Sequence, residues 1–173
     1  MSRRLFLFRH GKSDWNAAFA SDHERPLSLR GERDAQNMGM LLASSGTPLP
    51  QLVICSTAVR ARSTLDLALR AGDWAPEVVM SEALYATSAE KVLQLIRKLP
   101  AKEERVMLVG HEPTWSELIC NFTGGRVRMP TAAMARLDFP LSRWEDLDFD
   151  QGELVWLLQP RFFRKFRYTG RRH

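Results

Sequence analysis

The sequence predicts an α/β domain, a three-layer α/β/α sandwich around a mainly parallel sheet. Four short runs are apolar on both faces rather than alternating, as expected of parallel strands that are covered on both sides. Longer segments with helical signals lie between them, so strand and helix alternate. With 173 residues, 45% hydrophobic and 26% charged, the chain has the size and balance of one domain with a full core, spanning 1–173.

The predicted parallel strands are LFLF (5–8), LVIC (52–55), EVVM (77–80) and VMLV (106–109). The last third of the chain changes character. Two further short strand candidates, AAMARLDFP and ELVWLLQP, flank an acidic loop. Together they predict an antiparallel hairpin at a sheet edge near the C-terminus.

Helix start and stop signals mark the segments between the strands. Ser28 is a predicted cap for RGERDAQNMGMLLASSG, and Gly46 is its predicted stop. ARSTLDLALRAG ends on Gly72, and SAEKVLQLIRKLP opens at Ser88. PTWSELICNFTGG begins with Pro113, a residue favoured at helix starts, and closes on a glycine pair.

The composition argues against a membrane protein, a disulfide-bonded protein and a metal-binding protein. No stretch approaches ~20 apolar residues, and no apolar segment with a cleavage site opens the chain, so we expect a cytoplasmic protein that does not insert into membranes. Cys55 and Cys120 lie in apolar runs without CxxC spacing, which predicts buried free thiols. The four histidines show no metal-ligand spacing, so we expect neither metal nor cofactor.

The net charge of +5 comes from the end of the chain. The basic, aromatic tail 161–173 holds six Lys and Arg residues and no acid, which leaves −1 for the rest. A nucleic-acid-binding protein would carry its basic face on the body of the domain, so we expect no such partner. We predict a solvated C-terminal helix docked through Phe162, Phe163 and Phe166, with docking to an acidic partner or an anionic surface as the alternative.

Polar and charged residues gather where the predicted strands end. The segments that follow the four strands are Arg9-His10-Gly11, Ser56 to Arg62, Ser81-Glu82 and Gly110-His111-Glu112-Pro113. Ligands of open α/β sheets bind beyond these carboxyl ends. A single histidine or arginine there is more often a solvated residue, but two of each, converging from separate strands, indicate a site.

Arginine and histidine in this combination favour phosphoryl chemistry. Arginines donate pairs of hydrogen bonds that match phosphate oxygens, and an imidazole can act as a nucleophile or as a further phosphate ligand. A neutral histidine that attacks phosphorus in line would form a phosphohistidine intermediate, which water then hydrolyses. Gly11, directly after His10, is expected to permit a close approach of the backbone.

Three segments carry a resemblance to a known family. LFRHGKSDWN and LVGHEPTW resemble the two signature segments of the histidine phosphatase superfamily, which has the phosphoglycerate mutase-like fold. STAVRARST resembles that family's second arginine segment, and order and spacing agree over about residues 5–140. The resemblance implies a hydrolase that forms a phosphohistidine enzyme intermediate. It also implies that the chain's short length and DHERPLSLRG place it near the small SixA-type phosphohistidine phosphatases, with an open pocket and a phosphorylated protein as substrate.

The resemblance implies roles for individual residues. His10 matches the phosphorylated nucleophile of the family. The residues implied to bind the phosphoryl group are Arg9, Ser13, Asn16, Arg25, Arg60 and His111. Glu82 is the candidate general acid, and a solvated loop glutamate is the alternative interpretation. An imidazole leaving group, with a pKa of ~6.5, would need that acid far less than an alkoxide would.

Other functions stay open. A small-molecule phosphomonoester phosphatase that uses Glu82 is one alternative, and a non-catalytic phosphoprotein-binding domain is another, although the presence of both His10 and His111 argues against it. Asp22 and Glu24 are weaker acid candidates. A cysteine phosphatase needs five residues between its cysteine and arginine, and CSTAVR has four.

Overall fold

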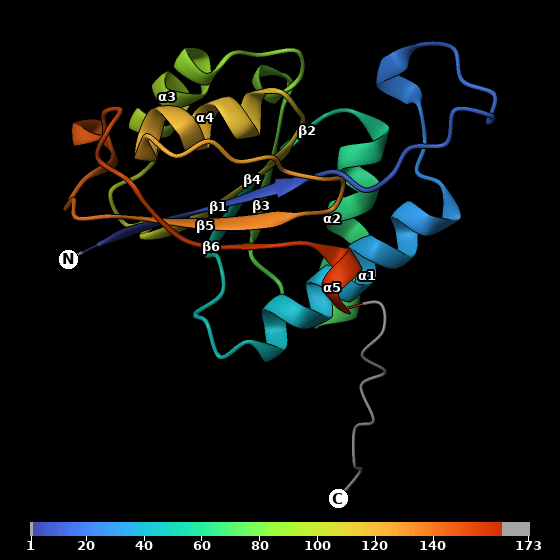
Figure 1. Ribbon diagram of the computed structural model, residues 1–173, viewed down its shortest axis with the longest axis horizontal. Helices are drawn as coiled ribbons and strands as arrows, with labels where there is room; N and C mark the ends of the chain where they lie inside the picture. The colour runs from blue at the N-terminus through green and yellow to red at the C-terminus, as the bar shows by residue number, and fades with distance from the viewer. Residues whose placement is uncertain (1, 164–173) are drawn as a thin grey trace, which may run out of the picture.

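The computed structural model describes residues 2–163 and has the predicted three layers, with a six-stranded sheet between two layers of helices (Figure 1). The strands are β1 (Arg3–Arg9), β2 (Leu52–Ser56), β3 (Glu77–Ser81), β4 (Arg105–Gly110), β5 (Met134–Phe139) and β6 (Glu153–Leu158). Their order across the sheet is β3-β2-β4-β1-β5-β6, and the first four are parallel to one another. The α/β prediction with a mainly parallel sheet is therefore confirmed.

Two helices cover each face of the sheet. The main helices are α1 (Leu29–Ser44), α2 (Val59–Gly72), α3 (Ala89–Arg97) and α4 (Thr114–Thr123), followed by the short α5 (Pro160–Phe163). Three 3₁₀ turns are η1 (Asp22–Glu24), η2 (Glu82–Leu84) and η3 (Trp144–Asp146). The core beneath α1 and α2 is separate from the core beneath α3 and α4, so the sheet is buried on both sides.

The central strand β1 shows how a continuous apolar run becomes part of two cores. Leu5 and Leu7 pack toward α3 and α4, whereas Phe6 and Phe8 pack toward α1 and α2. All four side chains have no exposed surface. LFLF does not alternate with polar residues because both faces of the strand are buried. This packing also holds the carboxyl end of the strand in place within the sheet.

The predicted helix starts are observed. The Ser28 side chain accepts a hydrogen bond from the backbone amide of Gly31, and Ser88 does the same for Lys91. Pro113 is the N-cap of α4, which ends before Gly124 with a left-handed backbone at φ 72°. Among residues 2–163, no helix is long and apolar enough to cross a membrane.

Strand β3 differs from the prediction. EVVM was expected to be buried, but β3 lies at the edge of the sheet and pairs only with β2. Val78, Val79 and Met80 are 41–43% exposed. The apolar residues follow the strand propensity of valine, but an edge strand lacks a neighbour and enough helix cover to bury both faces.

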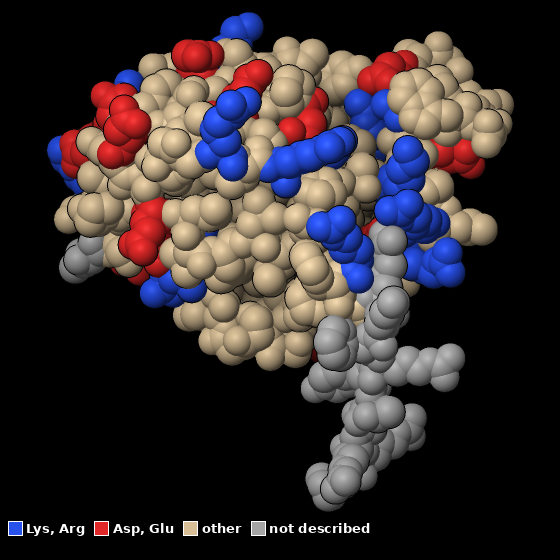
Figure 2. Space-filling view, in the orientation of Figure 1, with Lys and Arg blue, Asp and Glu red and all other residues tan. Residues whose placement is uncertain are grey.

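The C-terminal strands form the predicted antiparallel edge. β5 is antiparallel to β1, and β6 is antiparallel to β5 and ends the sheet. In the tail, Phe163 packs against the core beneath α1 and α2, whereas Phe162 is exposed. Phe166 and the rest of 164–173 lie outside the described residues, so the tail prediction is not tested. On the face in Figure 2, acidic side chains lie mostly on the left and along the top, and several basic side chains gather to the right of centre.

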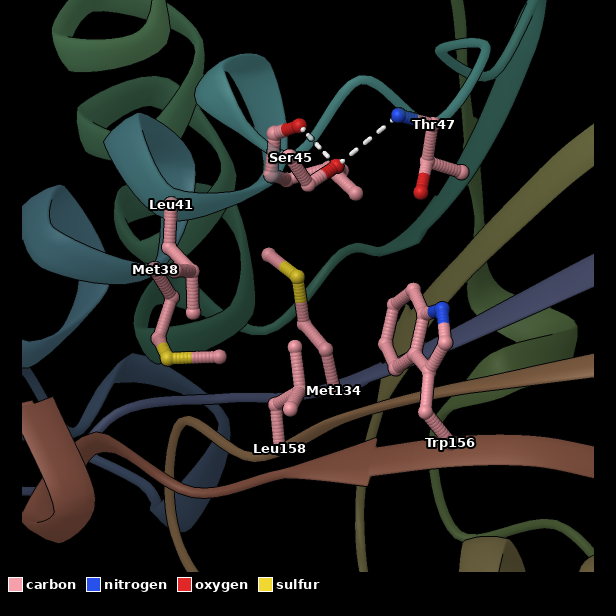
Figure 3. A pocket seen from close by; sticks show the side chains of 8 residues that line it. Met38, Leu41, Ser45, Thr47, Met134, Trp156 and Leu158 are labelled. Carbon is pink, nitrogen blue, oxygen red and sulfur yellow. Dashed lines mark hydrogen bonds between the residues drawn. The ribbon is translucent and has the colours of Figure 1, made fainter.

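One hollow lies away from the carboxyl ends of the parallel strands. It is a cavity of about 240 Å³ between α1 and the β5–β6 edge. Its lining is mostly apolar, with Met38, Met134 and Trp156 around it (Figure 3). None of the histidines or arginines predicted to act on phosphate lines it.

Candidate active site

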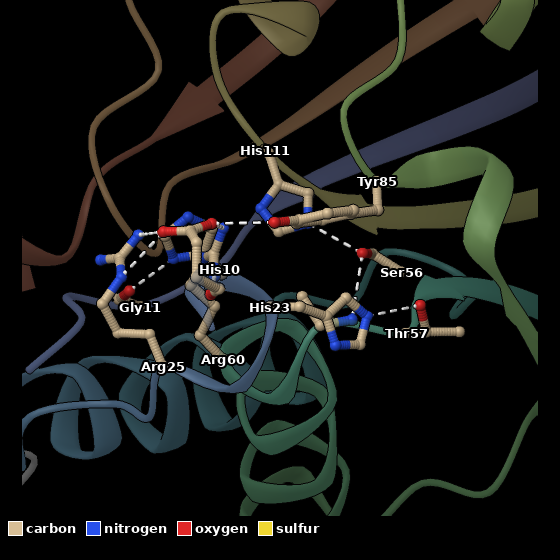
Figure 4. Close-up of polar contacts among 11 residues, drawn as sticks. His10, Gly11, His23, Arg25, Ser56, Thr57, Arg60, Tyr85 and His111 are labelled. Atoms are coloured by element: carbon tan, nitrogen blue, oxygen red, sulfur yellow. Dashed lines mark hydrogen bonds and ion pairs between the residues drawn. The ribbon is translucent and has the colours of Figure 1, made fainter. Parts of the chain in front are cut away.

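The carboxyl ends of three neighbouring parallel strands deliver the predicted residues to one place. β1 ends on Arg9 and leads into His10, and the register pairs Arg9 with Gly110, just before His111. The two imidazole rings are therefore neighbours, with centroids 5.1 Å apart. Figure 4 shows them above the start of α2, the helix that follows β2 and carries Arg60.

The hydrogen bond of His10 defines which ring nitrogen is free. Its Nδ1 lies 2.7 Å from the carbonyl oxygen of Gly11. A carbonyl oxygen only accepts, so Nδ1 carries the proton and Nε2 holds an unshared electron pair. Burial, with the charges of His111 and the nearby arginines, outweighs the opposing effect of the Gly11 hydrogen bond and lowers the pKa of His10 to about 3. At neutral pH the ring is therefore neutral.

His111 is held through its other nitrogen. Its Nε2 lies 2.8 Å from Oγ of Ser56, at the end of β2. Burial, followed by the charge of Arg60, lowers the pKa of His111 to about 4. Its Nδ1 is buried and has no hydrogen-bond partner among the described residues. When the Ser56 hydroxyl donates to Nε2, the proton of the neutral ring is on Nδ1, ready for an anionic ligand.

Close backbone packing positions the loop after His10. The amide of Gly11 donates to Oγ1 of Thr64 at 2.9 Å, and that hydroxyl donates to the carbonyl of Arg60 at 2.6 Å. A Cβ atom on Gly11 would lie 2.6 Å from the carbonyl oxygen of Gly31, a distance that real Cβ atoms do not tolerate. The expected close approach at Gly11 is confirmed. Gly11 contacts Gly31 of α1 and Thr64 of α2, and these contacts hold the loop after His10 in place.

Arg60 and Arg25 converge on one carboxylate. Arg60 donates to the backbone oxygen of Asp22 at 2.6 Å and to its Oδ2 at 3.0 Å. Arg25 donates to Oδ1 through Nε at 3.2 Å and Nη2 at 2.8 Å. Partial burial raises the pKa of Asp22, but hydrogen bonds from Arg25 and Tyr85 and the charge of Arg60 outweigh it and bring it to about 2. Asp22 is therefore ionised at neutral pH.

Several donors in the site have no partner among the described residues. They are Nε of Arg9, Nε of Arg60 and Nδ1 of His111, all buried. Arg9 is anchored by a 2.7 Å hydrogen bond from its Nη1 to the carbonyl of Met129, so its position is fixed even though its Nε is unused. Buried donors without acceptors are costly, and together they suit a ligand rich in negatively charged oxygens.

Comparison with known proteins agrees with this geometry. Residues 5–85 match the model of the histidine phosphatase superfamily (branch 1). The chain belongs to the histidine phosphatase superfamily. It is 32% identical to an uncharacterized chloroplastic protein of Arabidopsis thaliana over 92% of this chain and 77% of that protein.

Solved structures support the same family and the phosphoglycerate mutase-like fold. A protein of Agrobacterium tumefaciens assigned as phosphohistidine phosphatase SixA is 28% identical, with a TM-score of 0.78 over 91% of this chain and 98% of that one. A SixA-assigned protein of Nakamurella is 27% identical, with a TM-score of 0.78 over 92% of this chain and 97% of that one. The histidine phosphatase fold is thus shared along nearly the whole length.

The structure gathers some of the predicted residues and places others apart. Arg9, His10, Arg25, Arg60 and His111 lie together as described above. The other three are Ser13, Asn16 and Glu82. Ser13 is buried in a backbone bridge to Leu27, and Asn16 is exposed. Glu82 begins η2, is exposed, and makes no side-chain hydrogen bond or ion pair within residues 2–163.

Four residues at the site had no role in the sequence-based prediction of phosphate ligands. Tyr85 packs its ring edge-on against His111 at 5.6 Å and donates to Oδ2 of Asp22 at 3.0 Å. His23 packs against Tyr85 at 4.9 Å and shares a hydrogen bond with Thr57. The third and fourth are Asp22 and Ser56. Ser56 sits at a predicted strand end, so its position was available as a signal.

Cys55 does not fit the role of a nucleophile. Its side chain is completely buried within β2, in the core beneath α1 and α2. Burial, followed by the charge of Asp66, raises the pKa of its thiol to about 12. The reactive thiolate would hardly form at neutral pH, so the structure argues against a cysteine phosphatase.

The protonation state of His10 provides a direct test. In a pH titration followed by ¹H–¹⁵N NMR of the imidazole rings, His10 should remain neutral, with the proton on Nδ1, down to about pH 4, where an ordinary imidazole with a pKa of ~6.5 is charged. The unfolded chain binds more protons in this window, so the free energy of unfolding should fall as pH drops from about 6.5 toward 4. A free-enzyme pKa well above 6.5 would contradict the nucleophile assignment.

Proposed function

We propose that this histidine phosphatase hydrolyses a phosphoryl group through a covalent intermediate on His10, and that its substrate is a protein that carries phosphohistidine. The observation that carries the proposal is the state of His10. Its ring is buried, neutral and oriented by Gly11 so that Nε2 is unprotonated, and it lies beside His111 and two arginines whose buried Nε atoms are unused. This is the combination that in-line attack on phosphorus requires.

The chemistry takes two displacements. Arg9, Arg60 and His111 donate to the phosphoryl oxygens and neutralise their charge, while Nε2 of His10 attacks phosphorus. The Nε2–P bond forms as the bond from phosphorus to the leaving nitrogen or oxygen breaks, and the leaving atom departs with that electron pair. The ring then carries a positive charge, which the Nδ1–H bond to the Gly11 carbonyl stabilises. In the second step water attacks phosphorus and releases a proton to solvent, the electron pair of the P–Nε2 bond returns to His10, and inorganic phosphate leaves.

The carboxylates near the site favour a leaving group that needs no acid from the protein. Asp22 is the carboxylate held by the arginines, and with a pKa of about 2 it has no proton to give at neutral pH. Glu82 is exposed and has no side-chain contact that directs it toward His10 within the described residues. A phosphohistidine whose other ring nitrogen is protonated by solvent releases neutral imidazole, whereas an ester must release an alkoxide.

The similarity to SixA-assigned proteins supports the same substrate class, since those structures match this chain over nearly its full length. A phosphomonoester phosphatase with Glu82 as general acid is the second candidate. It is favoured by the position of Glu82 in η2, the turn that ends next to Tyr85 at the site. A side chain this exposed is free to rotate toward a bound ester. A phosphoprotein-binding domain without turnover would not need His10 to be held with Nε2 unprotonated.

A substrate panel distinguishes these functions. We expect kcat/KM for a phosphohistidine peptide to exceed that for aryl and sugar phosphates, and Glu82→Gln to leave the peptide rate unchanged within about twofold. Glu77→Gln is the matched control, because Glu77 is an exposed glutamate at the other end of β3. A preference for esters together with a large loss in Glu82→Gln alone would favour the phosphomonoesterase. Binding without turnover of any substrate would favour the binding domain.

A further inference from the structure

Asp22 occupies an unusual place for an acidic residue in a pocket that binds phosphate. Its two carboxylate oxygens accept four hydrogen bonds, two from Arg25 on Oδ1 and one each from Arg60 and Tyr85 on Oδ2. The distances run from 2.8 to 3.2 Å. Figure 4 shows Arg25 and Arg60 converging beside His10. In the free protein, an internal anion thus takes the donors that a phosphoryl group would use.

The donors around the site fall into two groups. Nε of Arg60 and Nδ1 of His111 are buried and unpartnered within residues 2–163, so an incoming anion meets no competitor there. Nη2 of Arg60 and the guanidinium of Arg25 are instead bonded to the carboxylate of Asp22, and Nη1 of Arg60 is bonded to its backbone oxygen. A phosphoryl group that binds Nη2 of Arg60 and the guanidinium of Arg25 has to displace the Asp22 carboxylate.

The segment that carries Asp22 is suited to such a displacement. The Asp22 side chain is 50% exposed, and it belongs to η1, a three-residue turn in the arch 14–28. This arch extends outward from the rest of the fold in Figure 1. It is fixed at its base, where the amide of Asp14 donates to the carbonyl of Pro26 at 2.9 Å. The carboxylate can therefore swing toward solvent without breaking the base of the arch.

We propose that Asp22 is a specificity-determining residue whose carboxylate competes with phosphoryl groups for Arg60 and Arg25. The inference rests on the proposed function, since it assumes that this pocket binds phosphoryl groups. Inorganic phosphate has no further contacts with which to offset the displacement, so it binds weakly and the product leaves readily. A phosphorylated protein makes additional contacts around the pocket, and its binding is favoured over that of small anions.

Direct binding of inorganic phosphate tests this role. Isothermal titration of the full chain should show that Asp22→Asn binds phosphate about tenfold more tightly than the wild type, because a nearby like charge weakens anion binding. Glu24→Gln removes the same charge from the same turn, and Glu24 has no side-chain hydrogen bond or ion pair within the described residues. Its affinity should stay within about twofold of wild type. Asp22→Ala is a second variant that removes the same carboxylate. Its melting temperature shows whether any change in affinity comes from a folding defect.

The outcomes separate this inference from the proposed function. Unchanged or weaker phosphate binding in both Asp22 variants would overturn it, since the carboxylate would then be a spectator or would align the arginines. Equal tightening in Glu24→Gln would also overturn it, because net charge alone would explain the effect. Binding needs no turnover, so tighter binding in Asp22→Asn alone supports the inference even if no substrate is hydrolysed.

Discussion

His10→Ala should lower kcat by at least about 10⁴-fold, because removal of a catalytic nucleophile costs losses of this order in other hydrolases. The reason is the unique position of Nε2, which is unprotonated because Nδ1 donates to Gly11. Steady-state hydrolysis of a phosphohistidine peptide is the measurement. Cys55→Ser is the matched control for a second nucleophile, and it should keep activity within about threefold because its thiol is buried away from the pocket.

A folding defect must be separated from a catalytic one in this experiment. His10 is 7% exposed, so its removal leaves space in the site. His10→Gln retains much of the volume and lacks the nucleophilic imidazole, so it should be as inactive as His10→Ala while melting close to the wild type. Retention of more than about a tenth of the activity by a folded His10→Gln would contradict the assignment.

Arg60→Met should lower kcat/KM by about 10²- to 10³-fold, the loss expected when a buried donor to a transition-state oxyanion is removed. Methionine keeps an apolar stem and discards the charge and every N–H. Because the charge of Arg60 lowers the pKa values of both His10 and His111, we also expect NMR titration to show both pKa values rising in this variant. Arg60→Lys should recover little activity, since an ammonium cannot reproduce the planar fork of donors.

Arg62→Met is the control for this change. Arg62 lies on the same first turn of α2 but is exposed and makes no side-chain hydrogen bond or ion pair within residues 2–163. It should retain activity within about twofold and leave the titration of His111 unaltered. If Arg60→Met kept wild-type kcat/KM, or if both variants lost activity equally, Arg60 would not be a phosphate ligand.

The central residues of the site were predictable from the sequence because they follow the carboxyl ends of predicted strands. An apolar run with no alternation predicts a strand buried on both faces, and the carboxyl ends of parallel strands share one edge of a sheet. His10, His111 and Arg60 each follow such a run within a few residues, and the structure brings them together. The C-terminal hairpin was predictable from two short strand candidates on either side of an acidic loop.

The contacts made by Asp22 and Tyr85 depend on how loops and turns fold onto the sheet and helices. The periodicity of apolar residues does not predict these conformations. The contact of Asp22 with Arg60 requires the arch 14–28 to bend over the start of α2. Tyr85 enters the site because the turn η2 redirects the chain after β3, beyond the strand end. The exposure of β3 follows from its place at the sheet edge, and a strand's own residues do not specify its neighbours.

The covalent intermediate is the most direct test of the account. The enzyme would be mixed with excess ³²P-labelled phosphohistidine peptide, quenched within milliseconds in alkaline detergent, where phosphohistidine is stable, and mapped by mass spectrometry. We predict label on the imidazole of His10, lost when the sample is acidified and absent in His10→Gln. Label on another residue, or rapid turnover by the wild type with no labelled protein at any time point, would contradict the mechanism.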